Sequence, residues 1–200
     1  MAKAETELTF WDHLEELRRV LFRIAIAVIG VMVVAFCFKK PLFDIILAPK
    51  DSNFITYRFF YKIAELFGVT SISPEKFDIP LINTQLASQF LIHMNAALYA
   101  GVIVSSPYII YQLFRFVSPA LYDNEKRYSL RIIFWGYILF ISGVLLNYFV
   151  IFPLTFRFLG TYQVSPEVEN LITLTSYMDT LMMLSMMMGI VFELPILCWL

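Results

Sequence analysis

Four charged side chains lie directly before a long apolar segment, where they could bind a charged partner. Residues 8–23 read LTFWDHLEELRRVLFR, in which Glu15 precedes Arg18 and Arg19 by three and four positions and Glu16 precedes Arg19 by three. On one helix such pairs contribute only about 0.2–0.5 kcal/mol each. A carboxylate that stays unpaired could instead hold a guanidinium, which is always charged and binds carboxylate through two hydrogen bonds. The residue types leave both interpretations open.

A second charged stretch, SPALYDNEKRY at 118–128, follows another apolar segment. Pro119 interrupts the preceding helix because it lacks an N–H, and Glu125 lies among charges of both signs. A solvated turn is one interpretation. The other is that Glu125 supplies a second carboxylate on the same side as Glu16, so that the two together hold a pair of arginines.

The third candidate is Glu193, in the apolar stretch GIVFELPILCWL. It lies about 24 Å along a helix that starts near Tyr177, at 1.5 Å per residue. A carboxylate inside a span costs about 2.5–3.5 kcal/mol on insertion scales, which favours a functional role over a structural polar pair. Pro195 frees the carbonyl of Val191, so a protonated Glu193 could donate to it.

The elements that position these residues are membrane spans. Of 200 residues, 60% are hydrophobic and 16% charged, whereas a soluble domain averages roughly 45–50% apolar and about 25% charged. Four stretches can cross about 30 Å of hydrocarbon. They cover residues 20–38, 88–114, 129–152 and 177–200. The sequence therefore predicts an all-α, polytopic membrane protein, with residues 1–200 as a single integral-membrane domain and its helices kinked at prolines.

The lysines and arginines of the short flanking segments place the N-terminus inside. We therefore expect an inner amphipathic helix at 1–19 and an inner loop at 115–128. The outer loops then cover 39–87 and 153–176. Both outer loops contain ordered segments on this prediction. YRFFYKIAELFG (57–68) has the pattern of an interfacial helix, with Phe60, Ile63, Ala64 and Phe67 on one face, and VSPEVENLITL (164–174) has Ser165 as a helix cap before Pro166.

Polar residues inside the spans are expected to join helices. Pro107 frees the carbonyl of Ile103, and Ser105 or Ser106 could satisfy it. Gln112, like Asn95, Asn147 and His93, is expected to hydrogen-bond between or along helices.

Enzyme, metal and nucleic-acid functions find no support in the residues. The two histidines, His13 and His93, lie toward opposite ends of the predicted spans, and no nucleophile motif or Cys/His metal spacing occurs. The formal net charge is −1, which predicts no nucleic-acid partner. No cofactor is expected.

Several motifs together resemble the TatC family, the receptor subunit of the twin-arginine protein translocase. They are HLEELRRVLFR, SSPYIIYQLFRFVSPALYDNEKR, VIFPLTFRFL and FELP, in family order. The resemblance covers about residues 8–49 and 80–200, and nothing is transferred to the middle of the first outer loop, roughly 50–79. The family usually has six spans, so a chain with four lacks the last two.

The resemblance implies a receptor in the bacterial cytoplasmic membrane that binds paired-arginine signal peptides of folded proteins at its cytoplasmic face. It implies assembly with the single-span TatA and TatB proteins, self-association in a receptor complex, and export driven by the proton-motive force. The family's signal-peptide positions fall on Glu16, Arg18, Phe116, Pro119 and Glu125. Its intramembrane and assembly positions fall on Glu193, Gln112 and Pro49.

Two alternatives from other classes stay open on the residues alone. A proton-coupled secondary transporter would use Glu193 as a relay at the helix break beside Pro195. A structural membrane scaffold would have no ligand, and its inner-face charges would affect only assembly.

Overall fold

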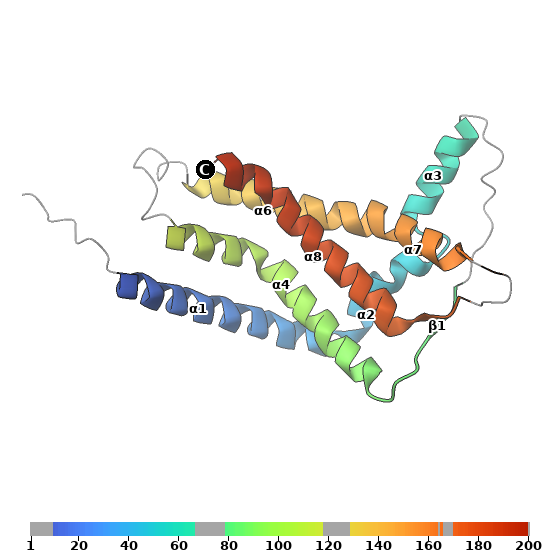
Figure 1. Cartoon of the computed structure of the whole chain (residues 1–200), viewed down its shortest axis with the longest axis horizontal. Coiled ribbons are helices and arrows are strands. Elements are labelled where there is room, and N and C mark those ends of the chain that lie inside the picture. Colours follow the sequence, from blue (N-terminus) through green and yellow to red (C-terminus); the bar gives the residue numbers. More distant parts are fainter. Residues whose placement is uncertain (1–9, 67–78, 118–128, 164, 166–169, 200) are drawn as a thin grey trace, which may run out of the picture.

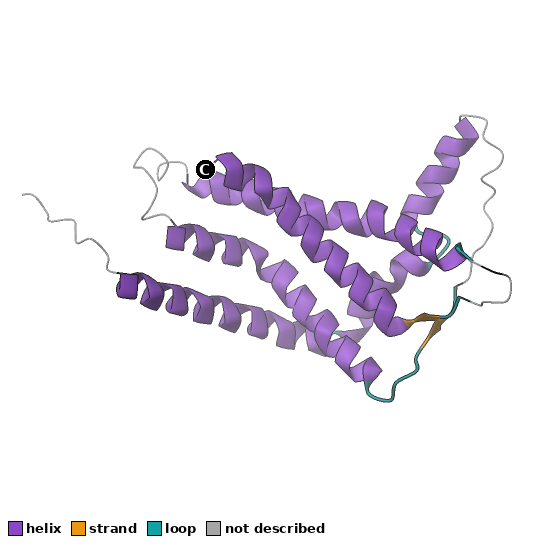
Figure 2. Ribbon diagram, viewed as in Figure 1, coloured by secondary structure: helices purple, strands orange, loops and turns teal. Residues whose placement is uncertain are grey.

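The protein is described by a computed structural model, which covers residues 10–66, 79–117, 129–163, 165 and 170–199. Most of these residues are helical (Figures 1 and 2). The helices are α1 (Phe10–Cys37), α2 (Lys39–Leu47), η1 (Ala48–Lys50), α3 (Ile55–Leu66), α4 (Ser88–Val117), α6 (Ser129–Leu146), the π-helical segment η3 (Asn147–Ile151), α7 (Phe152–Thr161) and α8 (Leu174–Trp199). Two short strands, β1 (Leu81–Ile82) and β2 (Ile172–Thr173), complete the described part.

Four helical segments are long and apolar enough to cross a membrane, which confirms the predicted fold class. They are His13–Cys37, Ser88–Phe116, Arg131–Thr161 and Leu174–Ile196. Each span packs against the next along the chain, α1 on α4, α4 on α6 and α6 on α8. We call the end where α1 begins the N-terminal end. The opposite end, where α2, α3, α7 and the strands lie, is the capped end (Figure 1).

The predicted surface helix at 1–19 and the first span are parts of one helix in the described residues. α1 runs without a break from Phe10 to Cys37 (Figure 1). Between Phe10 and Gly30 the sequence contains no proline or glycine that would end a helix. The charged turns of α1 therefore continue the axis of the first span.

The second span bends in its middle, where Pro107 lies inside α4 (Figure 2). Proline has no N–H to offer the carbonyl four residues earlier, and that carbonyl belongs to Ile103. The Oγ of Ser106 donates a 2.7 Å hydrogen bond to the Ile103 carbonyl, as the sequence predicted. Ser105 is also buried, but its Oγ has no partner among the described residues.

The third span is longer than predicted, because it continues through a π-helical turn into α7. Pro153, near the start of α7, cannot donate to the Phe149 carbonyl. The Oγ1 of Thr56, at the beginning of α3, donates to that carbonyl instead. A hydroxyl from a loop helix therefore satisfies a backbone group that the proline has freed.

The capped end contains a parallel strand pair that the sequence did not predict. Leu81 pairs with Ile172 and Ile82 with Thr173, so that the two loops at this end are joined. The predicted helix over 164–174 is therefore wrong at its C-terminal part. The Oγ1 of Thr173 accepts the N–H of Ser176, which ends the strand and caps the start of α8. The helix predicted at 57–68 is confirmed in its described part as α3.

Glycines let the spans approach closely. A Cβ placed on Gly143 of α6 would lie 2.5 Å from the Met188 carbonyl oxygen of α8, and one on Gly101 of α4 would lie 2.9 Å from the Val28 carbonyl oxygen of α1. These contacts are with backbone, which cannot rotate away. Small residues at such crossings are typical of helices that associate within lipid, where van der Waals packing replaces the hydrophobic effect.

Gly143→Ala is therefore expected to separate α6 from α8. We expect the free energy of unfolding in detergent to fall by about 1–3 kcal/mol, the usual cost of overpacking. Gly30→Ala is the matched control, because a Cβ on Gly30 meets nothing within 4 Å. Equal melting temperatures for the two variants would show that the close approach at Gly143 contributes nothing.

Candidate functional site

One predicted site residue, Phe116, contacts α1 at the N-terminal end, where the first turns of α1 lie beside the last turn of α4. The imidazole of His13 stacks on the ring of Phe116, with ring centroids 4.4 Å apart and planes 25° from parallel. Glu16 is partly buried one turn further along α1, and Arg18 is exposed. The stack fixes Phe116 against the charged turns of α1.

The four charges of this segment do not pair symmetrically. Arg19 Nη2 contacts Glu15 Oε1 at 2.6 Å, and both side chains are more than half exposed. This is one of the intrahelical pairs that the spacing predicted, and such pairs add little stability at an exposed position. Within the described residues Glu16 has no ion pair. Among the described residues, no cation competes for its carboxylate.

Two other predicted site residues, Pro119 and Glu125, lie outside the described residues. The helices on either side of them are described, since α4 ends at Val117 and α6 begins at Ser129. Both helix ends lie at the N-terminal end of the bundle (Figure 1). That Glu125 faces Glu16 stays a prediction.

Glu193 lies on α8 next to a space that a glycine creates on α6. A Cβ on Gly136 would lie 3.3 Å from Glu193 Oε2 and 3.5 Å from a methyl carbon of Ile110 on α4. The Oε1 atom of Glu193 is buried and has no hydrogen-bond partner among the described residues. Gly136 follows Arg131 by five residues, about 8 Å along a helix. The carboxyl group is therefore closer to the N-terminal end than to the middle of the bundle.

Gln112 lies on α4 two residues from Ile110, and so at a similar depth. Its Nε2 donates to the Tyr108 hydroxyl at 2.7 Å, while its buried Oε1 has no partner in the described part of the chain. Glu193 and Gln112 thus provide two unsatisfied oxygens toward one end of the bundle. Asn147 behaves differently, because its Nδ2 joins α6–α7 to α8 by a 2.8 Å bond to Ser185 Oγ, as expected for a residue that holds helices together.

Pro49, another predicted assembly residue, is buried at the capped end, far from the residues above. Its carbonyl and that of Pro153 accept the hydroxyl of Tyr57 at 3.3 and 2.8 Å. Burial raises the pKa of Tyr57, which therefore stays a neutral donor. In the described residues Pro49 belongs to the cap and does not join the N-terminal site.

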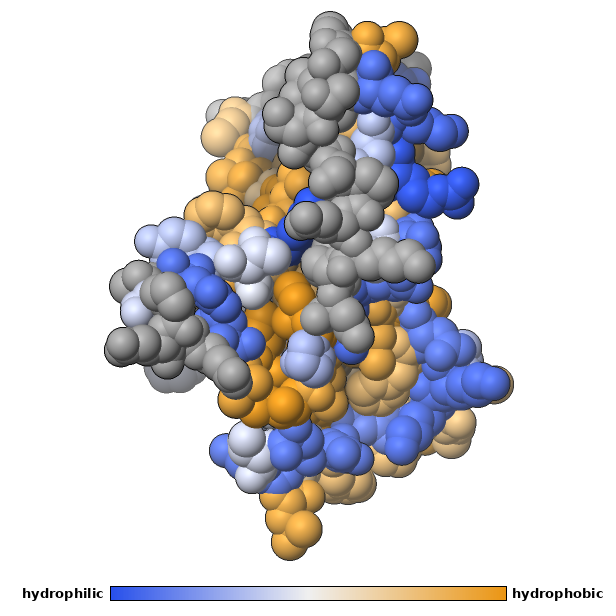
Figure 3. Space-filling view, turned by 90° about the vertical axis from the view of Figure 1, so that its right-hand side faces the viewer, coloured by the Kyte–Doolittle hydropathy of each residue, from blue (hydrophilic) through white to orange (hydrophobic). Residues whose placement is uncertain are grey.

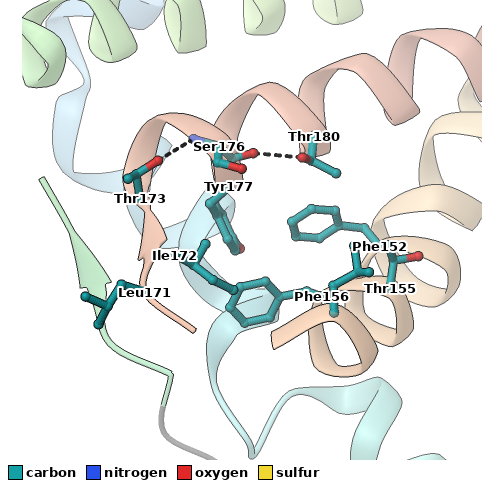
Figure 4. A pocket seen from close by; sticks show the side chains of 10 residues that line it. Phe152, Thr155, Phe156, Leu171, Ile172, Thr173, Ser176, Tyr177 and Thr180 are labelled. Carbon is teal, nitrogen blue, oxygen red and sulfur yellow. Dashed lines mark hydrogen bonds between the residues drawn. The ribbon is translucent and has the colours of Figure 1, made fainter. Parts of the chain in front are cut away.

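The capped end also has a pocket of about 250 Å³ between α7 and the start of α8 (Figure 4). The rings of Phe152, Phe156 and Tyr177 face one another in it, and threonine and serine side chains lie along α8. Those hydroxyls bond to nearby backbone, as when Thr180 donates to the Ser176 carbonyl. None of the described residues that line the pocket is charged.

Metal-binding geometry is not found in the described residues. No group of three or more His, Cys, Asp or Glu side chains that could hold an ion occurs there. Cys37, at the end of α1, and Cys198, in the last turn of α8, are both free and exposed.

Comparison with known proteins identifies the family. Residues 12–200 match the family model of the Sec-independent protein translocase protein TatC. The chain belongs to the TatC family. It is 36% identical over 199 residues to the TatC protein of a Blattabacterium species, covering 98% of this chain and 75% of that protein. It is 32% identical to TatC of Escherichia coli, covering 94% and 66%.

A solved structure has the same arrangement of helices. The crystal structure of the twin arginine translocase receptor TatC superposes with a TM-score of 0.71 at 30% sequence identity. The match covers 92% of this chain and 72% of that one. The chain is thus a component of a protein translocase, embedded in a membrane by several helices, and this family is not known for catalysis.

His13 is the site residue that sequence reasoning missed. In the sequence His13 suggests only a metal ligand, whereas in the structure its ring packs on Phe116 and so joins α4 to α1. The available signal was its spacing: His13 lies three residues before Glu16, on one face of the first turns of a helix. The partner, more than 100 residues away in sequence, had no local signal.

The stack predicts a specific crosslink. With Cys37 and Cys198 replaced by serine, His13→Cys together with Phe116→Cys should be joined by a short bifunctional thiol reagent in membranes, because the two side chains that they replace are in contact. His13→Cys with Leu98→Cys is the control. Leu98 lies 18 residues before Phe116 on α4, about 27 Å away along the helix. Equal yields for both pairs would rule out the contact.

Proposed function

We propose that the N-terminal end of this protein faces the cytoplasm and binds the paired arginines of twin-arginine signal peptides on folded proteins. The observation that carries the proposal is a partly buried carboxylate, Glu16, without an ion pair in the described residues, beside the His13–Phe116 stack. Membership of the translocase family and the likeness to a solved twin arginine translocase receptor support it. The protein then acts as the receptor of a protein-export system in the bacterial cytoplasmic membrane.

The chemistry of the pair suits this site. A guanidinium near 4 Å from a carboxylate gains about 4 kcal/mol at an effective dielectric constant of 20, before desolvation costs. Glu16 and Glu125 each take one arginine in this proposal, because two carboxylates can form two bidentate pairs. Arg18 and Arg19 restrict where a cation can bind in this proposal. Arg19 is paired with Glu15, and Arg18 repels cations that approach elsewhere on α1.

Phe116 and Pro119 shape the loop that presents Glu125. The ring of Phe116 is held by His13, which connects the last turn of α4 to α1. Pro119 prevents the helix from continuing into the loop. In this proposal the apolar segment of the signal peptide lies along α4 and α8, whose faces toward lipid are apolar.

Glu193, Gln112 and Pro49 serve assembly in this proposal. Glu193 is only partly buried, so single-span partners, TatA and TatB, or a second copy of the chain could reach its carboxyl group. The buried Gln112 would act through the packing of α4 beside it. Pro49 keeps the cap in place at the other end through its bond with Tyr57. Transport itself is driven by the proton-motive force.

The positive charges of the short flanking segments support this orientation. The first loop also carries lysine and arginine, but it is about 46 residues long and its positive charges are balanced by five acids. Arg18, Arg19 and Arg23 on α1, Arg115 at the end of α4 and Arg131 at the start of α6 all lie near the N-terminal end. Loops rich in lysine and arginine stay in the cytoplasm. The capped end then faces the periplasm.

The transporter alternative rests on Glu193 alone. Because the chain belongs to a protein translocase family, an intramembrane glutamate no longer needs a transporter to explain it. A scaffold without a ligand is separated from a receptor by the experiment below. Loss of assembly without loss of peptide binding would favour the scaffold.

Replacing Glu16 and Glu125 by glutamine, singly and together, should abolish photocrosslinking of a twin-arginine signal peptide to the protein in membranes. The matched control is Glu15→Gln, because Glu15 already pairs with Arg19 and should not be needed. Unchanged crosslinking in the double variant would reject the arginine site. An equal loss in Glu15→Gln would reject the special role of Glu16.

Glu193→Leu removes the carboxyl group but keeps a side chain of similar size. We expect reduced crosslinking to the single-span partners and reduced export, while peptide binding at the N-terminal end persists. Val191→Leu, on the exposed face of α8, is the control. Normal export and normal partner crosslinking after Glu193→Leu would make Glu193 a purely structural residue.

A further inference from the structure

Helix α3 presents an apolar face that the described part of the protein does not cover. Ile55, Phe59 and Leu66 are 63%, 61% and 82% exposed. They lie within about 40° of one another around the helix axis, and Arg58, Lys62 and Glu65 fill the adjoining sector of about 60°, at 3.6 residues per turn. Lys62 lies nearest the apolar sector, about 20° from Ile55. A helix with an apolar side and a compact charged side is typical of a membrane surface.

The base of α3 is held rigidly against the third span. Thr56 donates to the Phe149 carbonyl, and Tyr57 donates to the Pro153 carbonyl at 2.8 Å. Arg157 adds a third contact, because its Nη1 donates to the Tyr61 hydroxyl at 3.0 Å while its guanidinium carbon lies 5.6 Å from the centre of the Tyr61 ring. These contacts fix both the depth of α3 and the direction in which its exposed side points.

That depth can be measured along the spans. Phe149 lies 18 residues beyond Arg131, about 27 Å at 1.5 Å per residue. The first span gives a similar value, since Lys39 lies 20 residues beyond Arg19, or about 30 Å. A bilayer has a hydrocarbon core about 30 Å thick. The base of α3 is therefore at the boundary between hydrocarbon and headgroups.

The direction of α3 agrees with this depth. The helix projects sideways from the capped end, across the direction of the spans (Figure 1). Figure 3, which looks onto the capped end, shows hydrophobic and hydrophilic atoms side by side over the upper part of the molecule, where α3 lies. Exposed apolar side chains at this depth suit the boundary of a bilayer.

We propose that α3 lies in the lipid interface at the capped end, with Ile55, Phe59 and Leu66 among the acyl chains and Arg58 and Lys62 on phospholipid phosphates. The partner is the membrane surface. Apolar side chains suit the acyl region, and the two cations, against the single acid Glu65, suit phosphate. The helix thereby anchors the cap that Tyr57 and Arg157 hold to the spans. This inference does not depend on signal-peptide binding.

Spin labels at two positions of α3 test it. With Cys37 and Cys198 replaced by serine, Phe59→Cys and, as the matched control, Glu65→Cys are labelled and the full chain is reconstituted into vesicles of phosphatidylethanolamine and phosphatidylglycerol. Collisions of a spin label with oxygen, which concentrates in lipid, and with a nickel chelate, which stays in water, show whether the label lies in lipid or in water. We expect the label at residue 59 to collide with oxygen and to lose nickel access, and the label at 65 to keep nickel access.

Two outcomes would overturn the proposal. Equal nickel access at residues 59 and 65 would place the whole helix in water. Loss of access to both oxygen and nickel at residue 59 would mean that protein, from a second copy or another chain, covers the apolar side. Neither outcome bears on Glu16, so failure here is distinguishable from failure of the arginine site.

Discussion

The structure depends on one constraint: inside lipid, every backbone N–H and C=O must find a partner within the protein. A proline inside a helix leaves one carbonyl without its backbone partner, and at two such positions a hydroxyl group donates to that carbonyl instead. Ser106 satisfies the carbonyl freed by Pro107, and Thr56 satisfies the carbonyl freed by Pro153. The second hydrogen bond comes from α3, a helix of the loop at the capped end, and so connects the cap to a span. The kinks and the cap are thus consequences of the same requirement.

The same constraint concentrates chemistry at the two ends of the bundle. Charged side chains that cannot enter lipid cheaply gather at the N-terminal end, where Glu16 and the His13–Phe116 stack lie. Glu193 of α8 is a charged residue within a span. It lies beside the space left by Gly136 of α6, which is about 8 Å along that helix from Arg131. At the capped end the charges of α3 lie next to its exposed apolar residues. Both proposals, the arginine site and the lipid-bound helix, follow from where charge can remain at a membrane boundary.

Much of this architecture could be predicted from the sequence, because apolar length and proline positions are local signals. The four spans, the Ser106 bond and the helix α3 are of this kind. The parallel pair of β1 and β2 could not be predicted, since two-residue strands carry no alternation and their partners are about 90 residues apart. The wrong helix at 164–174 has the same cause: Ser165 and Pro166 are good start signals, but Ile172 and Thr173 are taken by a long-range pairing.

The sequence predicts which residue types belong to the candidate site, but only part of how these residues are arranged in space. Glu16 and Phe116 were identified from their motifs, whereas the stacking of His13 on Phe116 joins two helices far apart in sequence. Likewise, the depth of Glu193 depends on which residue of α6 faces it. A single sequence shows that Gly136 is a glycine, but not that its missing side chain leaves room for a carboxyl group.

The most direct test of the central claim is a double-mutant cycle on affinity. Twin-arginine and twin-lysine signal peptides are titrated against the membrane-embedded protein and against its Glu16→Gln variant. A bidentate arginine contact predicts that the wild type prefers arginine and that the variant loses this preference, with a coupling energy of at least about 1 kcal/mol. If the preference for arginine is the same in both proteins, Glu16 does not hold the arginine pair.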